Sequence, residues 1–278
     1  MSEQIETPQG APTGFWQATT IDLAHCLRFY SRLPVPPLPW EQNAHALPDF
    51  SRLVRVLPLA GLILGGIPAL VFALSYFLAL GPWLSATLAV AAATLTTGAF
   101  HEDGLADTAD SFGGSTRERR LEIMRDSRIG SFGASALFLG LLLRIGALAG
   151  LTSVAGWQTG MLALLITASL SRTIGLMPLV FLPPARIDGA AYAVGQPTRE
   201  GFWFAAALAG LITIILGMIG NLPPSGVALM LILSGLTGWG FIRLSMKHLG
   251  GQTGDIAGAT QQIAEIAALI GLLTAAQP

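Results

Sequence analysis

Apolar residues in this chain come in long runs, separated by short segments that hold most of the polar residues. Each run is close to the ~20 residues that a helix needs to cross a bilayer. The fourth and the seventh runs carry polar residues, so tilts or breaks are expected there. The pattern predicts about seven transmembrane helices, at residues 57–80, 83–100, 132–151, 157–182, 201–220, 225–246 and 256–276.

The composition fits this interpretation. Of 278 residues, 52% are hydrophobic and 11% are charged, with a mean hydropathy of +0.62. A soluble domain carries about 25% charged residues, so the chain is predicted to be an all-α, polytopic integral membrane helix bundle. A net charge of −1 excludes bulk attraction to nucleic acid. Cys26 is the single cysteine, which leaves neither an internal disulfide nor a cysteine zinc site.

The N-terminal segment differs from the rest of the chain. Residues 1–20 lack the basic start and apolar core of a signal peptide and are predicted to be a disordered polar tail. Residues 21–278 are predicted to form one membrane-embedded catalytic domain. Within it, residues 21–55 are apolar, aromatic and rich in arginine and proline, which favours an interfacial helix followed by an extended surface segment. Gly61 and Gly65 have the small-xxx-small spacing that permits close helix packing.

Charged residues alternate along the predicted topology. Arginines and lysines gather before the first span, between the second and third, after the fourth and at the end of the sixth. The connections at residues 81–82, 152–156 and 221–224 have none. The positive-inside rule then predicts a cytoplasmic N-terminus and an outer C-terminus. Because the basic connections also hold most acidic residues, the active site is predicted on the cytoplasmic side.

One segment concentrates acidic side chains: HEDGLADTADSFGG, His101–Gly114, with four carboxylates within nine residues and no Lys or Arg. If the second span continues as a helix past Phe100, then Asp103, Asp107 and Asp110 share one face at i, i+4 and i+7. Glu102 lies off that face. Like charges at this spacing destabilise a helix, and Mg²⁺ shared with phosphate oxygens would relieve the cost. The alternative is a solvated acidic cap at a helix end.

A basic segment follows, RERRLEIMRDSRIGSFG, Arg117–Gly133. Arg125 and Arg128 are about one helical turn apart, and arginine forks bind phosphate oxygens in pairs. The alternative for a basic helix beside a bilayer is contact with anionic lipid headgroups. That role is expected for three arginines of this segment, namely Arg117, Arg119 and Arg120.

The third polar segment is HLGGQTGD, His248–Asp255, just before the last span. Its glycines predict a flexible loop. Asp255 is placed to cap the N-terminus of the final helix, and a catalytic role is the alternative.

Two arginines fall inside predicted spans, where charge is costly and is a functional hypothesis by default. Arg172, near the cytoplasmic half of its span, is predicted to reach a substrate at the membrane face. Arg144 lies deeper and is expected to snorkel or to pair with Glu265. Gln261 and Glu265, at i and i+4, favour a buried polar contact between helices.

Four ordered motifs carry a family resemblance that covers nearly the whole chain from about residue 21. Their order and wording resemble those of the cobalamin synthase family, the adenosylcobinamide-GDP ribazoletransferases of vitamin B12 synthesis. The resemblance is weakest around Glu102, so the three aspartates are taken as the predicted core. The motifs are RFYSRLPVP (Arg28–Pro36), GAFHEDGLADTADSFGG (Gly98–Gly114), RLEIMRDSRIGSFG (Arg120–Gly133) and LGGQTGD (Leu249–Asp255).

The resemblance implies that adenosylcobinamide-GDP reacts with α-ribazole or its 5′-phosphate to give adenosylcobalamin or its phosphate plus GMP. It implies a multi-pass protein of the bacterial cytoplasmic (inner) membrane, surrounded by lipid, with Mg²⁺ as cofactor. One aspartate or His101 would take the proton of the attacking hydroxyl. The metal ligands would be Asp103, Asp107 and Asp110, and the substrate-binding residues Arg32, Arg125, Arg128, Arg172, Gln252, Thr253 and Asp255.

Two other functions fit parts of the pattern. A CDP-alcohol phosphotransferase also uses helix-borne aspartates with Mg²⁺, but its Asp-Gly is followed by Ala-Arg, whereas Leu105-Ala106 follows here. A transporter would use the carboxylates as an ion site, although such sites usually lie near the bilayer midplane. The oligomeric state is open, and a homo-oligomer is one alternative.

Overall fold

The structure is a computed structural model, and it describes residues 14–44, 46–126, 128–187 and 190–277. Within these residues no strand forms, and helices make up most of the chain. Most of the predicted tail, residues 1–13, lies outside the described residues. The tail boundary predicted at residue 20 is wrong, because helix α1 (Phe15–Tyr30) already begins at Phe15.

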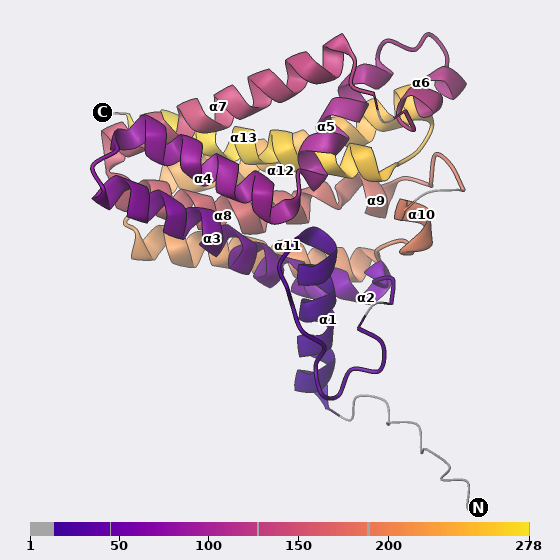
Figure 1. Cartoon of the computed structure of the whole chain (residues 1–278), viewed down its shortest axis with the longest axis horizontal. Helices are drawn as coiled ribbons and strands as arrows, with labels where there is room; N and C mark the ends of the chain where they lie inside the picture. Colours follow the sequence, from indigo (N-terminus) through magenta and orange to yellow (C-terminus); the bar gives the residue numbers. More distant parts are fainter. Residues whose placement is uncertain (1–13, 45, 127, 188–189, 278) are drawn as a thin grey trace, which may run out of the picture.

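Seven helices lie side by side along one direction in Figure 1, which confirms a polytopic helix bundle. Six of them are long and apolar enough to cross a membrane on their own, counting α8 together with the short helix that follows it. The remaining one, α4, spans about 25 Å at 1.5 Å per residue. The seven are α3 (Leu57–Phe77), α4 (Gly81–Thr97), α7 (Ser131–Ala155), α8 (Trp157–Gly175), α11 (Arg199–Ile219), α12 (Pro224–Leu249) and α13 (Gly254–Ala276).

The second predicted span does not continue past Phe100, contrary to the expectation. Helix α4 ends at Thr97, and Gly98 and Ala99 both adopt positive φ, 67° and 59°. Helix α5 (Phe100–Ser111) then starts at an angle of 90° to α4. A Cβ at Gly98 would lie 2.2 Å from the Arg32 guanidinium, so both the backbone angle and the packing require glycine there.

Helix α5 therefore lies across one end of the bundle instead of extending the second span (Figure 1). It is not counted among the membrane-spanning helices, because its four carboxylates and its direction do not suit the hydrocarbon core. The acidic residues keep their predicted i, i+4, i+7 spacing, since α5 is itself an α-helix.

Of the two spans in which tilts or breaks were expected, the fourth is broken and the seventh is not. The fourth span is interrupted at Leu176, between α8 and α9 (Met177–Phe181). Pro178 lies in the first turn of α9, where a residue without an N–H is tolerated. The seventh span, in contrast, is the continuous helix α13.

The polar connections all emerge at one end of the bundle, here called the polar end. It holds α5, α6 (Arg117–Ile123), α9, α10 (Ala190–Ala193) and the loop at residues 250–253. The opposite end has only the short turns near residues 78–80, 156 and 220–223, and the C-terminus lies there in Figure 1. The structure thus gathers on one end the segments that the charge pattern assigned to one side.

The N-terminal segment forms a helix and then an irregular segment between α1 and α2, here called the strap, as predicted. In Figure 1, α1 runs roughly perpendicular to the bundle at the polar end. The strap leads to α2 (Phe50–Leu53) and the short helix η1 (Val54–Val56). Arg28 fixes the strap, because its guanidinium donates to both oxygens of Glu41, at 2.5 and 2.9 Å, and to the Pro36 carbonyl.

The contact between α3 and α8 confirms the close packing predicted from small residues. A Cβ on Gly61 would lie 2.6 Å from the Ala168 carbonyl oxygen, and one on Gly65 would lie 2.6 Å from the Ala168 Cβ. Only glycine lets α3 approach α8 this closely. This contact places the buried polar part of α8 next to the start of α5.

Candidate functional site

Helix α5 has two faces with different partners. His101 and Glu102 are buried at 4% and 6% exposure, whereas Asp103 is exposed and Asp107 and Asp110 are half-buried. The face with the aspartates opens at the polar end, and the other face packs into the bundle. Glu102, which the sequence left off the aspartate face, is therefore an interior residue.

Two glycines bring α5 onto the start of α13. A Cβ on Gly104 would lie 2.8 Å from the Asp255 carbonyl oxygen and 3.2 Å from the Gly258 Cα. This close crossing carries Asp255 to the aspartates of α5, so that Asp255 repels Asp107 more strongly than Asp110 does. The open acidic face thus consists of Asp103 and Asp107 from α5 together with Asp255 from α13.

The negative charge of Asp107 is only partly compensated. Burial, followed by repulsion from Asp103, Asp255 and Asp110, raises its pKa to about 7. Arg186 acts in the opposite direction, and its guanidinium lies 3.6 Å from Asp255. A divalent cation at this face would favour the ionised carboxylate, so the donor set suits Mg²⁺, which binds through one or two carboxylates, waters and phosphate oxygens.

Asp110 has a different partner. Its Oδ2 accepts from the Gly130 N–H at 2.7 Å and its Oδ1 accepts from the Gly133 N–H at 2.8 Å. These N–H groups belong to the first turn of α7, where the helix dipole also favours an anion. Asp110 therefore caps α7 from a neighbouring helix, and neither Gly130 nor Gly133 has room for a Cβ beside its carboxylate.

Among the described residues, no group of three or more Asp, Glu, His or Cys side chains is arranged to hold a metal ion by itself. The metal-ligand set of Asp103, Asp107 and Asp110 stays a prediction. The geometry offers Asp255, more readily than Asp110, as the third carboxylate of the open face.

The loop before α13 is built differently from the expectation. Thr253, not Asp255, is the N-cap of α13, because its Oγ1 accepts from the Ile256 N–H at 3.2 Å. Gln252 exchanges backbone hydrogen bonds with Pro183 and Ala185, at 2.8 and 2.9 Å. This pairing holds the segment with Arg186 next to Asp255. Arg186 was not among the predicted site residues, and its only signal in the sequence is a charge two residues after the pair Pro183-Pro184.

Two arginines expected at the lipid headgroups are tied to the protein. The Arg117 guanidinium donates to the carbonyls of Leu249 and Ala185, at 2.6 and 2.7 Å. Arg120 donates to the His248 carbonyl at 3.3 Å. They join α6 to the loop at residues 248–253, and their contact with lipid headgroups stays a prediction. Arg119 is exposed and pairs with Glu122 at 2.7 Å.

The predicted phosphate-binding arginines lie on the surface. Arg128 is 87% exposed in its side chain and forms a two-pronged pair with Asp126, with a closest approach of 2.6 Å. Arg125 and Arg32 are exposed as well, and Arg32 lies against Gly98. Their roles in substrate binding stay predictions.

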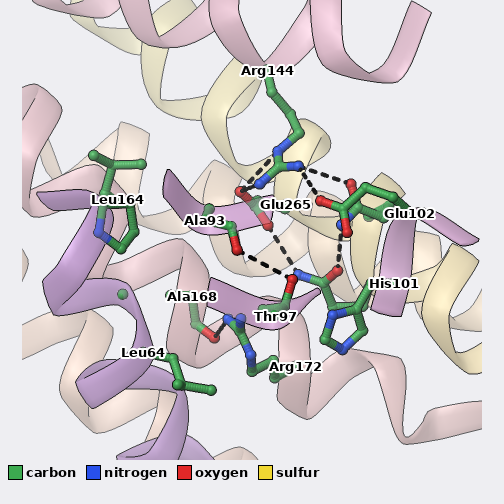
Figure 2. A pocket seen from close by; sticks show the side chains of 14 residues that line it. Leu64, Ala93, Thr97, His101, Glu102, Arg144, Leu164, Ala168, Arg172 and Glu265 are labelled. Carbon is green, nitrogen blue, oxygen red and sulfur yellow. Dashed lines mark hydrogen bonds and ion pairs between the residues drawn. The ribbon is translucent and has the colours of Figure 1, made fainter. Parts of the chain in front are cut away.

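A buried ion-pair cluster lies on the inner face of α5. Arg144, in the middle of α7, pairs with Glu102 at 2.9 Å and with Glu265 at 3.0 Å, as Figure 2 shows. The predicted pair with Glu265 is confirmed, and Glu102 is an additional partner. The Gln261 amide donates to Glu265 and to Ser171, at 2.9 and 2.8 Å, which confirms the polar contact between helices.

Arg172 and His101 lie on the other side of the same small cavity (Figure 2). Arg172 is 8% exposed and donates to the Ala168 carbonyl at 2.9 Å, while its Nε has no hydrogen-bond partner. The His101 ring stacks on Tyr30, with centroids 5.7 Å apart and planes 4° apart. His101 thus points into the protein, on the face of α5 opposite to the exposed Asp103, and its role as a base stays a prediction.

Comparisons with known proteins agree on one family. A family model described as cobalamin-5-phosphate synthase matches residues 22–273. Adenosylcobinamide-GDP ribazoletransferases from Azorhizobium caulinodans and Xanthobacter autotrophicus are 48% and 46% identical to the chain. The matches cover 92% and 91% of this chain and 97% and 95% of those proteins. No solved structure matches the chain. The chain belongs to the cobalamin-5-phosphate synthase family.

Proposed function

We propose that this protein is an adenosylcobinamide-GDP ribazoletransferase, which joins α-ribazole or its 5′-phosphate to adenosylcobinamide-GDP and releases GMP. The names of its relatives support the reaction. The observation that carries the site is the open acidic face of Asp103, Asp107 and Asp255 at the polar end. Three carboxylates near one arginine suit a cation shared with a pyrophosphate better than they suit a purely structural contact.

In this reaction a ribose hydroxyl of the acceptor attacks the phosphorus nearer the cobinamide. A new P–O bond forms, the bond to the GMP phosphate breaks, and the hydroxyl proton passes to a carboxylate of the acidic face or to water. Positioning and charge stabilisation are expected to dominate the catalysis, as in phosphoryl transfer generally.

Asp103 and Asp107 would hold Mg²⁺, with waters and phosphate oxygens as its remaining ligands. When bound, the ion neutralises charge that develops on the departing phosphate. Arg186 beside Asp255 is a further candidate for contact with a phosphate oxygen, since its Nη1 is buried without a hydrogen-bond partner.

We also propose that the polar end faces the cytoplasm of a bacterial cell, at the inner membrane. The basic residues of the chain gather in connections that emerge at this end, as the positive-inside rule expects for cytoplasmic loops. Substrates that are water-soluble would then reach the acidic face without crossing the bilayer.

The test is GMP release by the purified protein in lipid nanodiscs, with adenosylcobinamide-GDP, α-ribazole and Mg²⁺. Wild type is expected to release GMP, and Asp107→Asn to lower kcat by about 10²-fold or more. Asp103→Asn is expected to act in the same direction. Each substitution removes a charge and keeps the shape, so folding is preserved.

Glu122→Gln is the matched control, because Glu122 also lies at the polar end and its side chain is 68% exposed. Its kcat is expected to equal that of wild type. Absence of GMP from the wild-type reaction would overturn the proposed reaction. Undiminished release by both aspartate variants would overturn the proposed site.

A further inference from the structure

An aromatic cavity lies beside the acidic face, between α1, α5, α8 and α13. Its volume is about 60 Å³. This is about four times the volume that one buried water needs. Four aromatic side chains from α1, α2 and α5 line it, namely Phe29, Tyr30, Phe50 and Phe100. The cavity therefore has room for a small flat group and offers it an apolar wall.

The aromatic wall is ordered by its own contacts. Phe29 meets Phe50 and Phe100 edge to face, with centroids 5.3 and 5.4 Å apart. Tyr30 stacks on His101 at the base of the same wall. Aromatic rings held in this way recognise another aromatic ring by stacking or edge contact, and they give a bare phosphate no donor.

The polar floor of the cavity supplies one unused donor. Arg172 and Gln261 both line the cavity. The Gln261 amide is fully engaged, since its nitrogen donates to Ser171 and Glu265 and its oxygen accepts from Gln262. The Arg172 Nε–H is buried and has no partner. A buried donor without an acceptor is costly, which points to an acceptor supplied by a ligand.

The cavity and the acidic face are built on the same two helices, α5 and α13. Phe100 and His101 line it from α5, three and two residues before Asp103. Gly254, Ala257 and Gly258 line it from the first turns of α13, around Asp255. A flat ring in the cavity and a reacting group at the acidic face therefore fit one ligand that has an aromatic base and a polar extension.

We propose that this cavity binds the heterocyclic base of the acceptor, with the Arg172 Nε–H donating to a ring nitrogen of that base. The inference rests on the proposed function, because it takes α-ribazole as the acceptor. Its benzimidazole base is flat and largely apolar. One ring nitrogen carries the ribose, and the other is a free hydrogen-bond acceptor.

The test uses two phenylalanines at the ends of the same helix. Phe100 is 45% exposed and lines the cavity, whereas Phe112 is 41% exposed, follows α5 and contacts His248. KM is measured for each substrate with the full-length protein in nanodiscs. Phe100→Ala is expected to raise KM for α-ribazole about tenfold, an effect of the size expected for one lost aromatic contact, and to leave KM for adenosylcobinamide-GDP within about twofold. Phe112→Ala is expected to change neither.

A second measurement does not depend on turnover. Binding of free benzimidazole and of indole is compared by saturation-transfer NMR, because indole has the same shape but lacks the acceptor nitrogen. Wild type is expected to bind benzimidazole more tightly. Arg172→Met is expected to remove the preference and to leave indole binding unchanged, while Ala257→Leu, which fills the cavity, weakens binding of both.

The two proposals fail in different ways. If wild type binds benzimidazole selectively but releases no GMP, the cavity assignment is supported and the proposed reaction is overturned. If GMP is released and Phe100→Ala changes neither KM, or raises both equally, the cavity assignment is overturned alone. Equal binding of indole and benzimidazole by wild type would overturn the role of Arg172.

Discussion

Two neighbouring residues of α5, Glu102 and Asp103, belong to regions with opposite electrostatics. Glu102 is buried and paired with Arg144, which also neutralises Glu265. Asp103 is exposed on the face that it shares with Asp107 and Asp255. Among the described residues, Arg186 is the one cation paired with this face, and its guanidinium lies 3.6 Å from the Asp255 carboxylate. In the first region the protein supplies the counter-charge, so the carboxylates hold helices together. In the second the counter-charge is incomplete, which leaves those carboxylates for a ligand.

The largest expected effect comes from removing the cation of the buried region. Arg144→Met leaves Glu102 and Glu265 unpaired at 8% and 9% side-chain exposure. We expect a loss of about 3–5 kcal/mol in the free energy of unfolding, because an uncompensated buried charge costs that much. Unfolding in detergent, followed by circular dichroism, measures it.

The matched control adds Glu102→Gln and Glu265→Gln to Arg144→Met. Because this triple variant removes both unpaired carboxylates but still buries Arg172, it is expected to recover part of the lost stability. Wild-type stability of the single variant would show that the cluster does not hold α5, α7 and α13 together.

The second prediction separates Asp110 from the open face. Asp110→Ala is expected to lower the free energy of unfolding by about 1 kcal/mol, because the first turn of α7 loses its cap. Asp110→Asn keeps one acceptor oxygen and is expected to lose less. Asp126→Ala, at an exposed site nearby, serves as the control in the same unfolding assay. Unchanged stability with lost GMP release would instead assign Asp110 to the metal.

The third prediction concerns pH at the open face. The pKa of Asp107 is raised to about 7 by burial and by its acidic neighbours, so the folded protein favours the protonated form. Its contribution to stability is fully present below about pH 4 and is lost as the pH rises through about 7. In Mg²⁺-free buffer, the Tm of wild type is therefore expected to fall between pH 5 and 8 relative to Asp107→Asn. A constant Tm difference between the two proteins would contradict it.

The smallest effect is expected at Glu41, whose carboxylate pairs with Arg28 outside the bundle core. The Arg28 guanidinium holds the pKa of Glu41 down to about 2, against the opposing effect of burial. Because the folded pKa is depressed, the stabilisation is present above about pH 4.5 and is lost as the pH falls toward 2. The hydrogen-exchange protection factors of α1 amides, which correct for the intrinsic pH dependence of exchange, are expected to fall over this range in wild type. Glu41→Gln should exchange fast throughout, and equal rates at pH 6 would contradict the role of the pair.

Much of the candidate site was predictable from local spacing. Asp103 and Asp107 share a face because i and i+4 positions do so in any helix, wherever that helix lies. The motif around Asp255 was likewise visible as a polar segment before the last span. The partners were not predictable, since Arg144 lies 42 residues from Glu102, and Gly130 lies 20 residues from Asp110.

The sequence by itself determined the helix bundle and its polar end. A bilayer requires apolar runs of about 20 residues whose backbone groups are hydrogen-bonded within the helix. Each such run is a contiguous stretch of the sequence. The family was also readable, because its motifs are contiguous segments.

Only the tertiary structure decided which carboxylates are neutralised and which are left for a ligand. That division depends on the sharp turn at Gly98 and Ala99 and on the close crossing of Gly104 with Gly258. These contacts bring together residues that are far apart in the sequence. Helical spacing separates Glu102 from Asp103, but electrostatic energy depends on distance in space, so no local pattern identifies the counter-charge of either residue.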